Sequence, residues 1–121
     1  MSVVDVRDIV AVAAAALTQP GHEGATYTIT GPAAVTHAEI AAAISAATGQ
    51  EIAFADVPPA AFEEQLRELL PPWQLAGLME DYAHYARGEA ADVSPDVAAV
   101  TGRPVRSMEA FFTEHAAAFA R

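Results

Sequence analysis

The sequence of 121 residues carries sixteen acidic and six basic side chains, which gives a formal charge of -10 at pH 7. A surface this acidic repels phosphate backbones and anionic lipid head groups, so we expect binding to neither nucleic acid nor membranes. The sequence has no cysteine, which excludes a disulfide framework and a thiolate metal site and favours a cytoplasmic location.

The length predicts a single domain that covers residues 1–121. Hydrophobic residues make up 53% of the chain but aromatic residues only 7%, so we expect alanine-rich helices that pack closely around few large side chains. The longest apolar run, residues 9–17, is about half as long as a membrane-spanning helix. We therefore expect no membrane span.

The first predicted helix begins at Asp5 or Asp8, either of which can cap its free amide groups, and ends at the turn QPG. Residues 9–17 carry no polar side chain, and a helix that is apolar all round requires burial on every side. Two arrangements would bury it. The helix contacts a second copy in a dimer, or it lies at the centre of the domain between the predicted helices 40–47 and 111–119.

Alternating and β-branched residues predict short strands at residues 26–30 and 51–57, and residues 89–93 can form a third. Between the first two strands, Thr36 and Glu39 form a capping box, and Gly49 supplies the left-handed residue that ends the helix. The expected fold class is α+β, a mostly helical domain with two or three short strands.

Proline residues organise the second half of the chain. Pro58-Pro59 and Pro71-Pro72 each begin a helix, which predicts a helical hairpin. Ser94-Pro95-Asp96 predicts a short helix that ends at Gly102. Ser107 caps a last helix with apolar side chains at spacings of three and four.

The candidate functional residues lie on the helix that follows Pro72. Trp73, Met79, Tyr82 and Tyr85 share this helix, and they either pack in the core or line a small-molecule cavity. The four histidines show no paired ligand spacing, so no metal site is predicted. The glycines of GHEG, residues 21–24, lie between a helix and a strand, the reverse of the order in a dinucleotide loop, so no cofactor-binding residue is predicted.

Three stretches carry a resemblance to a known family: VDVRDIVAVAAAALT, then YTITGPAAVTHAEIAAAISAATGQEIAFADVPPAAF, and finally VTGRPVRSMEAFFTEHAAAF. They resemble the carboxyl-terminal part of NmrA-like NAD(P)-binding proteins, of the atypical short-chain dehydrogenase/reductase superfamily. The resemblance implies an N-terminal Rossmann half with a glycine-rich dinucleotide loop, and this sequence does not contain one. We therefore expect a truncated or free-standing substrate-side domain without its own NAD(P) site.

Three functional hypotheses follow. The favoured one is a small-molecule-binding domain derived from the substrate side of an NmrA-like reductase, with a cavity lined by the helix from Trp73 to Tyr85 and by the segment after Pro59. The second is an interaction or regulatory module that forms a homodimer or pairs with a separate Rossmann subunit. The third is a small cofactor-independent isomerase or cyclase that uses Tyr82, Tyr85, His84 or Asp81 as acid or base. The sequence assigns no catalytic residue, so it leaves open whether the protein is an enzyme.

Overall fold

The computed structural model describes residues 1–120, and within this range the chain is mostly helical. Its helices, in chain order, are α1 (Val6–Thr18), α2 (His37–Thr48), α3 (Pro59–Leu66), α4 (Pro72–Ala86), α5 (Asp96–Thr101), α6 (Met108–Glu114) and α7 (Ala116–Phe119). None of these helices combines the length and the apolar character that crossing a bilayer requires.

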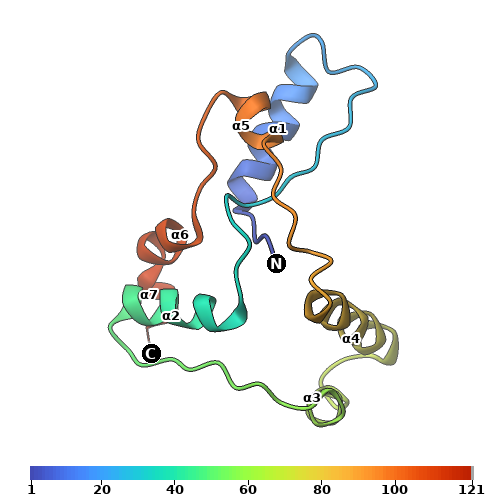
Figure 1. Ribbon diagram of the computed structural model, residues 1–121, viewed down its shortest axis with the longest axis vertical. Coiled ribbons are helices and arrows are strands. Elements are labelled where there is room, and N and C mark those ends of the chain that lie inside the picture. Colours follow the sequence, from blue (N-terminus) through green and yellow to red (C-terminus); the bar gives the residue numbers. More distant parts are fainter. Residues whose placement is uncertain (121) are drawn as a thin grey trace.

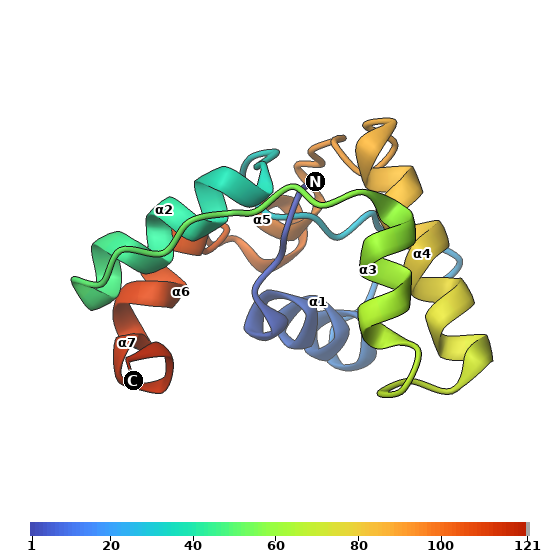
Figure 2. The same cartoon turned by 90° about the horizontal axis from the view of Figure 1, so that it is seen from below.

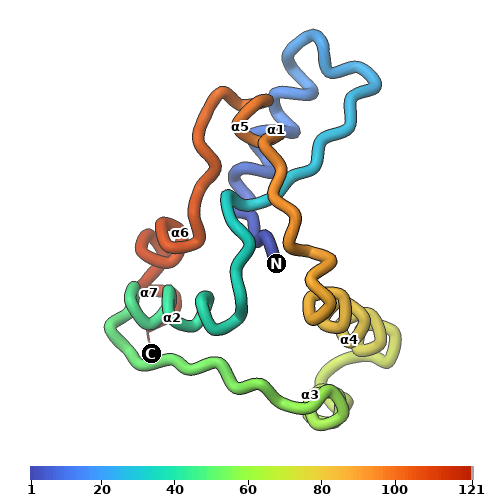
Figure 3. Tube along the Cα trace, in the orientation of Figure 1, coloured from blue at the N-terminus to red at the C-terminus, as the bar shows by residue number. Residues whose placement is uncertain are grey.

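The helices form three groups joined by extended segments (Figure 1). α1 packs against α5, α2 packs against α6 and α7, and α3 packs against α4. The tube in Figure 3 shows the long connections between the groups, and Figure 2 shows residues 50–58 passing from the α2 group to α3. The chain exposes 8116 Å², whereas a compact protein of 12.6 kDa exposes about 6200 Å². The arrangement is therefore open, with a small core in each of its parts.

Local capping determines several helix ends as the sequence predicts. The Asp5 carboxylate accepts a hydrogen bond from the Arg7 amide and begins α1. The capping box of Thr36 and Glu39 is complete at the start of α2, and Gly49 ends that helix with φ 71°. Ser107 caps α6, but the last predicted helix divides at His115 into α6 and α7.

The predicted strands are wrong for the part of the chain that the structure describes. No strand forms at residues 26–30, 51–57 or 89–93, because no neighbouring strand supplies a ladder of backbone hydrogen bonds. Side chains accept hydrogen bonds from some of the backbone amides of these segments. The Thr28 amide donates to the Asp96 carboxylate at 2.7 Å, and the Ile52 amide donates to the Ser45 hydroxyl at 2.9 Å. The fold is thus mostly helical rather than α+β with strands.

Helix α1 buries one face only. Val12 and Ala15 are buried beside α5, where Val97 is 1% exposed. On other faces Val10 is 61% exposed and Leu17 is 86% exposed. The expected central position between the helices 40–47 and 111–119 is therefore wrong, because α1 packs mainly on α5 and the chain is too open to surround it.

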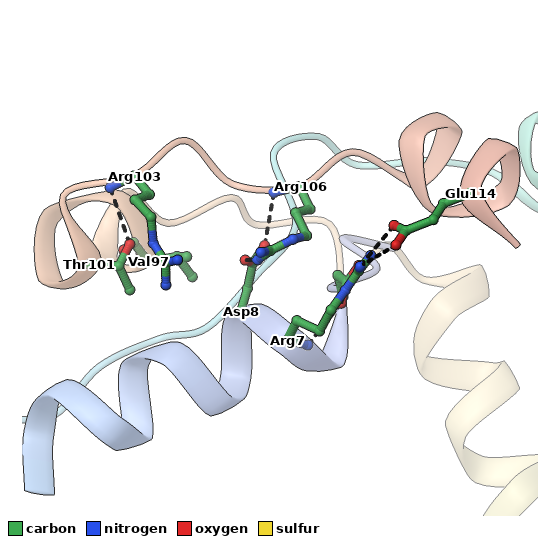
Figure 4. A network of polar contacts seen from close by, with 8 residues as sticks. Arg7, Asp8, Val97, Thr101, Arg103, Arg106 and Glu114 are labelled. Atoms are coloured by element: carbon green, nitrogen blue, oxygen red, sulfur yellow. Dashed lines mark hydrogen bonds and ion pairs between the residues drawn. The ribbon is translucent and has the colours of Figure 1, made fainter.

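Two ion-pair groups connect the start of α1 to the carboxyl-terminal segment (Figure 4). The buried Asp8 carboxylate accepts hydrogen bonds from the Arg106 amide, at 2.8 Å, and from the Arg106 guanidinium. The Arg7 guanidinium bridges Asp5, at 2.6 Å, and Glu114, at 2.8 Å. These contacts link α1 to α6 and to the segment before it. They involve charged partners, whose hydrogen bonds are stronger than neutral ones.

Neutralising Asp5 tests how much its local ion pair with Arg7 stabilises the fold. Hydrogen bonds from the Arg7 side chain lower the pKa of Asp5 from 3.8 to about 2. A lowered carboxylate pKa stabilises the fold above the unfolded-state value, and this stability is lost as the pH falls through the folded-state value. Asp5→Asn keeps a capping side chain, so we expect it to cost about 2 kcal/mol of unfolding free energy at pH 7, and this deficit to disappear as the pH falls from 4 to 2.

Urea unfolding followed by circular dichroism across that pH range measures the effect. The exposed Asp92, which makes no hydrogen bond or ion pair within residues 1–120, gives the control Asp92→Asn. A deficit for Asp5→Asn that stays constant from pH 7 to pH 2 would show that the ion pair does not provide this stability.

Gly31 allows two segments to approach each other closely. The chain start lies beside residues 31–35, where the Met1 ammonium donates to the Val35 carbonyl and the Val35 amide donates to the Met1 carbonyl, both at 2.8 Å. A Cβ atom on Gly31 would lie 1.8 Å from the Val3 carbonyl oxygen. Any larger residue would therefore separate these segments.

Gly31→Ala should lower the unfolding free energy by about 1–3 kcal/mol, because the backbone must move to make room for the methyl group. Gly77 provides a matched control, because a Cβ atom there meets nothing within 4 Å. Since Gly77 lies inside α4, Gly77→Ala should stabilise the protein by about 0.5–1 kcal/mol. Urea midpoints measure both. Equal effects of the two variants would contradict the close approach at Gly31.

Candidate ligand cavity

A cavity of about 630 Å³ lies where the α2 group meets α3 and α4. Its walls come from the chain start, the beginning of α2, the connecting segment 50–58, α3 and the second half of α4. The lining residues are Met1, Val35, Thr36, His37, Ala38, Phe54, Ala55, Asp56, Val57, Pro59, Phe62, Met79, Tyr82, Ala83, Tyr85 and Ala86. Most of these side chains are apolar or aromatic, as is usual for small-molecule sites.

Local sequence determines how each wall is built. The capping box at Thr36 begins α2 and places His37 at its first position. Pro58 is extended, with φ -56° and ψ 140°, and Pro59 begins α3, so the connecting segment runs directly into the helix. Pro71 and Pro72 repeat this pattern at α4. The two prolines at each junction stop the preceding segment and give α3 and α4 their antiparallel packing in the hairpin.

Three near-parallel rings, Phe54, His37 and Tyr82, form what we call the aromatic ladder. The His37 ring centroid lies 5.3 Å from that of Phe54, with 19° between the planes, and 5.5 Å from that of Tyr82, with 17° between the planes. The rings come from three different segments, the connecting segment 50–58, α2 and α4. Each such pair contributes about 0.5–1.5 kcal/mol beyond its buried area. The ladder therefore holds the walls of the cavity together.

Two further rings contact Tyr82 by their edges. Phe62 lies 5.2 Å from Tyr82 at an angle of 62°, and Tyr85 lies 5.7 Å from it at 69°. The ladder is not sealed from solvent, because Phe54 is 47% exposed and Tyr82 is 39% exposed. Ring faces and edges are thus available to a ligand.

The charged groups of the cavity are the Asp56 carboxylate and the Met1 ammonium. The Met1 ammonium is bonded to the Val35 carbonyl and lies near Glu39. Hydrogen bonds from the amide and hydroxyl of Thr36 lower the pKa of Glu39, and the nearby ammonium contributes in the same direction. Glu39 therefore stays ionised beside the chain start.

No metal centre is found in the part of the chain that the structure describes, where no three histidine, cysteine, aspartate or glutamate side chains gather in a ligand arrangement. His84 does contact a carboxylate, but the contact is on the surface outside the cavity. There, hydrogen bonds from Arg87 and His84 lower the pKa of Glu89 to about 2. This exposed cluster is an ion-pair group that needs no metal to explain it.

The structure brings together three of the four residues that the sequence analysis selected. Met79, Tyr82 and Tyr85 line the cavity, whereas Trp73 lies in the first turn of α4, is 74% exposed and does not line it. His84 and Asp81, the other acid-base candidates, also lie outside the lining.

The sequence analysis missed two aromatic members of the site, His37 and Phe54, whereas Phe62 lies in the segment after Pro59 that it expected to line the cavity. His37 directly follows the capping residue, which is a local signal for its position at the end of a helix. No local signal indicates that it stacks on two rings from distant segments.

No protein-family model matches the chain. Two curated relatives align with nearly all of it. The NAD(P)H azoreductase of Xenophilus azovorans is 42% identical over 120 residues, which are 98% of this chain and 42% of that protein. The (4-alkanoyl-5-oxo-2,5-dihydrofuran-3-yl)methyl phosphate reductase of Streptomyces griseus is 38% identical over 117 residues, which are 97% of this chain and 42% of that protein.

Solved structures contain the same fold. The NADPH-dependent quinone oxidoreductase of Escherichia coli matches 89% of this chain and 39% of its own, with a TM-score of 0.78 and 25% identity. The triphenylmethane reductase of Citrobacter sp., solved with NADP(H), matches 96% of this chain and 40% of its own, with a TM-score of 0.83 and 22% identity.

These relatives are reductases. The comparisons support the NAD(P)-dependent reductase superfamily that the sequence resemblance indicates, and the chain spans about two-fifths of the length of the curated relatives it matches.

Proposed function

We propose that this chain is a small-molecule-binding domain, derived from the substrate side of an NmrA-like NAD(P)-dependent reductase and without its own dinucleotide site. The observation that carries the proposal is the cavity of about 630 Å³ with the aromatic ladder in its wall. The volume falls in the range of about 300–1,000 Å³ that is typical of small-molecule sites. No nucleic acid, metal or membrane partner is proposed.

The relatives agree with this proposal. The names of two of them specify an NAD(P)H azoreductase and an NADPH-dependent quinone oxidoreductase. The dinucleotide part of the proposal rests on the described residues. No strand followed by a glycine-rich turn and a helix N-terminus occurs in residues 1–120, and that arrangement is what holds a pyrophosphate in dinucleotide-binding folds. Any reduction would then need a dinucleotide held by another polypeptide segment.

The binding proposal predicts a loss of affinity when the ladder is shortened. Calorimetric titration with 2-naphthol, a neutral aromatic probe, should show saturable binding to the unaltered protein. Tyr82→Ala should weaken that binding about five- to tenfold, because a ligand loses a stacking surface worth about 1 kcal/mol. The loss of affinity for 2-naphthol should occur without loss of helical circular dichroism, because Tyr82 is only half-buried.

Trp73→Ala is the matched control, since it removes a larger aromatic ring from the same helix at a position outside the cavity. Its affinity should remain within about twofold of the unaltered protein. If Tyr82→Ala and Trp73→Ala weaken binding equally, the cavity is not the binding site.

A second candidate function, a protein-interaction module, is favoured by one observation, the exposed apolar face of α1. Val6 is 63% exposed, Val10 is 61% exposed and Leu17 is 86% exposed. Contiguous apolar patches of this kind are rare on monomers and typical of interaction sites. The proposed partner is a second copy of the chain in a two-fold dimer or a separate Rossmann subunit.

Val10→Glu tests the dimer. The unaltered protein should be a dimer by light scattering, and Val10→Glu should be a folded monomer, because a charge in the apolar interface cannot be solvated there. Gln74→Glu, which places the same charge on an exposed position of α4, should remain dimeric. An unaltered protein that stays monomeric at high concentration would contradict the dimer.

A further inference from the structure

The charges around the cavity indicate what kind of aromatic ligand it selects. The sequence contains no lysine, and no arginine lines the cavity among residues 1–120. Of the arginines in that range, four are paired with carboxylates elsewhere: Arg7, Arg67, Arg87 and Arg106. The cavity thus offers no lysine or arginine side chain to an anionic ligand, and its His37 ring stacks between Phe54 and Tyr82.

The Asp56 carboxylate is the acidic group of the lining, and it is unpaired. It makes no hydrogen bond or ion pair with any residue in 1–120, whereas the other charged group, the Met1 ammonium, is bonded to the Val35 carbonyl and has Glu39 nearby. Two positions before Asp56 in the connecting segment, Phe54 begins the aromatic ladder. A carboxylate and aromatic ring faces are thus present in one wall.

Ring faces carry negative electrostatic potential and attract cations within about 6 Å of the ring centre. Phe54, Phe62, Tyr82 and Tyr85 all border the cavity. An unpaired carboxylate beside such rings also attracts cations, so the wall is complementary to a positively charged aromatic compound. A carboxylated or sulfonated compound of the same shape would be repelled by Asp56, and the Met1 ammonium of the lining already donates to the Val35 carbonyl and lies near Glu39.

From this complementarity we infer that the cavity selects planar aromatic cations over neutral and anionic compounds of the same size, and that Asp56 determines this preference. This inference rests on the proposed small-molecule function and specifies its ligand class. The connecting segment 50–58, which crosses from the α2 group to α3 (Figure 2), carries both Phe54 and Asp56 to the same wall.

Three bicyclic probes of similar size test the inference at pH 7: N-methylquinolinium as the cation, 2-naphthol as the neutral compound and 2-naphthoate as the anion. Calorimetric titration should give the cation at least tenfold tighter binding than the anion, with the neutral compound between them. Asp56→Asn should weaken binding of the cation about three- to tenfold and change binding of 2-naphthol by less than twofold.

The formal charge of -10 attracts any cation, so a matched charge control is required. Asp81→Asn removes the same charge from the adjacent position to Tyr82 on α4, outside the cavity lining. It should leave the affinities of the cation and of 2-naphthol within about twofold. Circular dichroism spectra of both variants should match that of the unaltered protein, because both aspartates are exposed.

The outcomes separate this inference from the proposed function. Equal binding of all three probes, or equal losses for Asp56→Asn and Asp81→Asn, would overturn the charge selection and leave small-molecule binding in place. Absence of binding by all three probes would overturn both. Tighter binding of 2-naphthoate than of N-methylquinolinium would reverse the assigned ligand class.

Discussion

The stacking of His37 between Phe54 and Tyr82 joins parts of the molecule that otherwise share few contacts. α3 and α4 pack on each other, whereas α2 packs on α6 and α7, so the two groups meet chiefly through ring contacts and the connecting segment 50–58. Because the same rings line the cavity, the contact that assembles the walls also provides the binding surface. Structure and ligand recognition depend on the same side chains at this place.

The chain has too small a core to cover all its apolar surface. Val12 and Val97 are buried in the group of α1 and α5, whereas Phe112 is buried in the group of α2, α6 and α7, so these residues do not form one continuous core. Charged contacts compensate in part. The Asp8 carboxylate accepts hydrogen bonds from Arg106 and so connects α1 to the segment before α6 (Figure 4). A protein of this kind gains stability from anything that binds the folded state, including a ligand in the cavity or a partner on α1.

The two unpartnered surfaces of the molecule differ in chemistry. The cavity is concave, lined by aromatic rings and bordered by the Asp56 carboxylate, which suits a small conjugated compound. The face of α1 around Val10 is a convex helix surface without polar groups, which suits another protein surface. Relatives such as the azoreductase are more than twice as long as this chain, so in those proteins further polypeptide is available to cover a corresponding helix.

The sequence by itself determined several helix ends and the aromatic helix of the site. The capping box at Thr36 depends on side chains within three residues of each other, and the proline pairs at 58–59 and 71–72 suit the first turn of a helix, so local patterns predict these helix starts. Only the tertiary structure decided the rest. A strand forms only beside a neighbouring strand that shares its backbone hydrogen bonds, and the extended segments in residues 1–120 have no such neighbour. The stack of His37 with Phe54 and Tyr82 joins rings that are distant in sequence. Local sequence therefore encodes neither feature. Trp73, selected for its place on the same helix as Tyr82, faces solvent because that helix meets the cavity only along its second half.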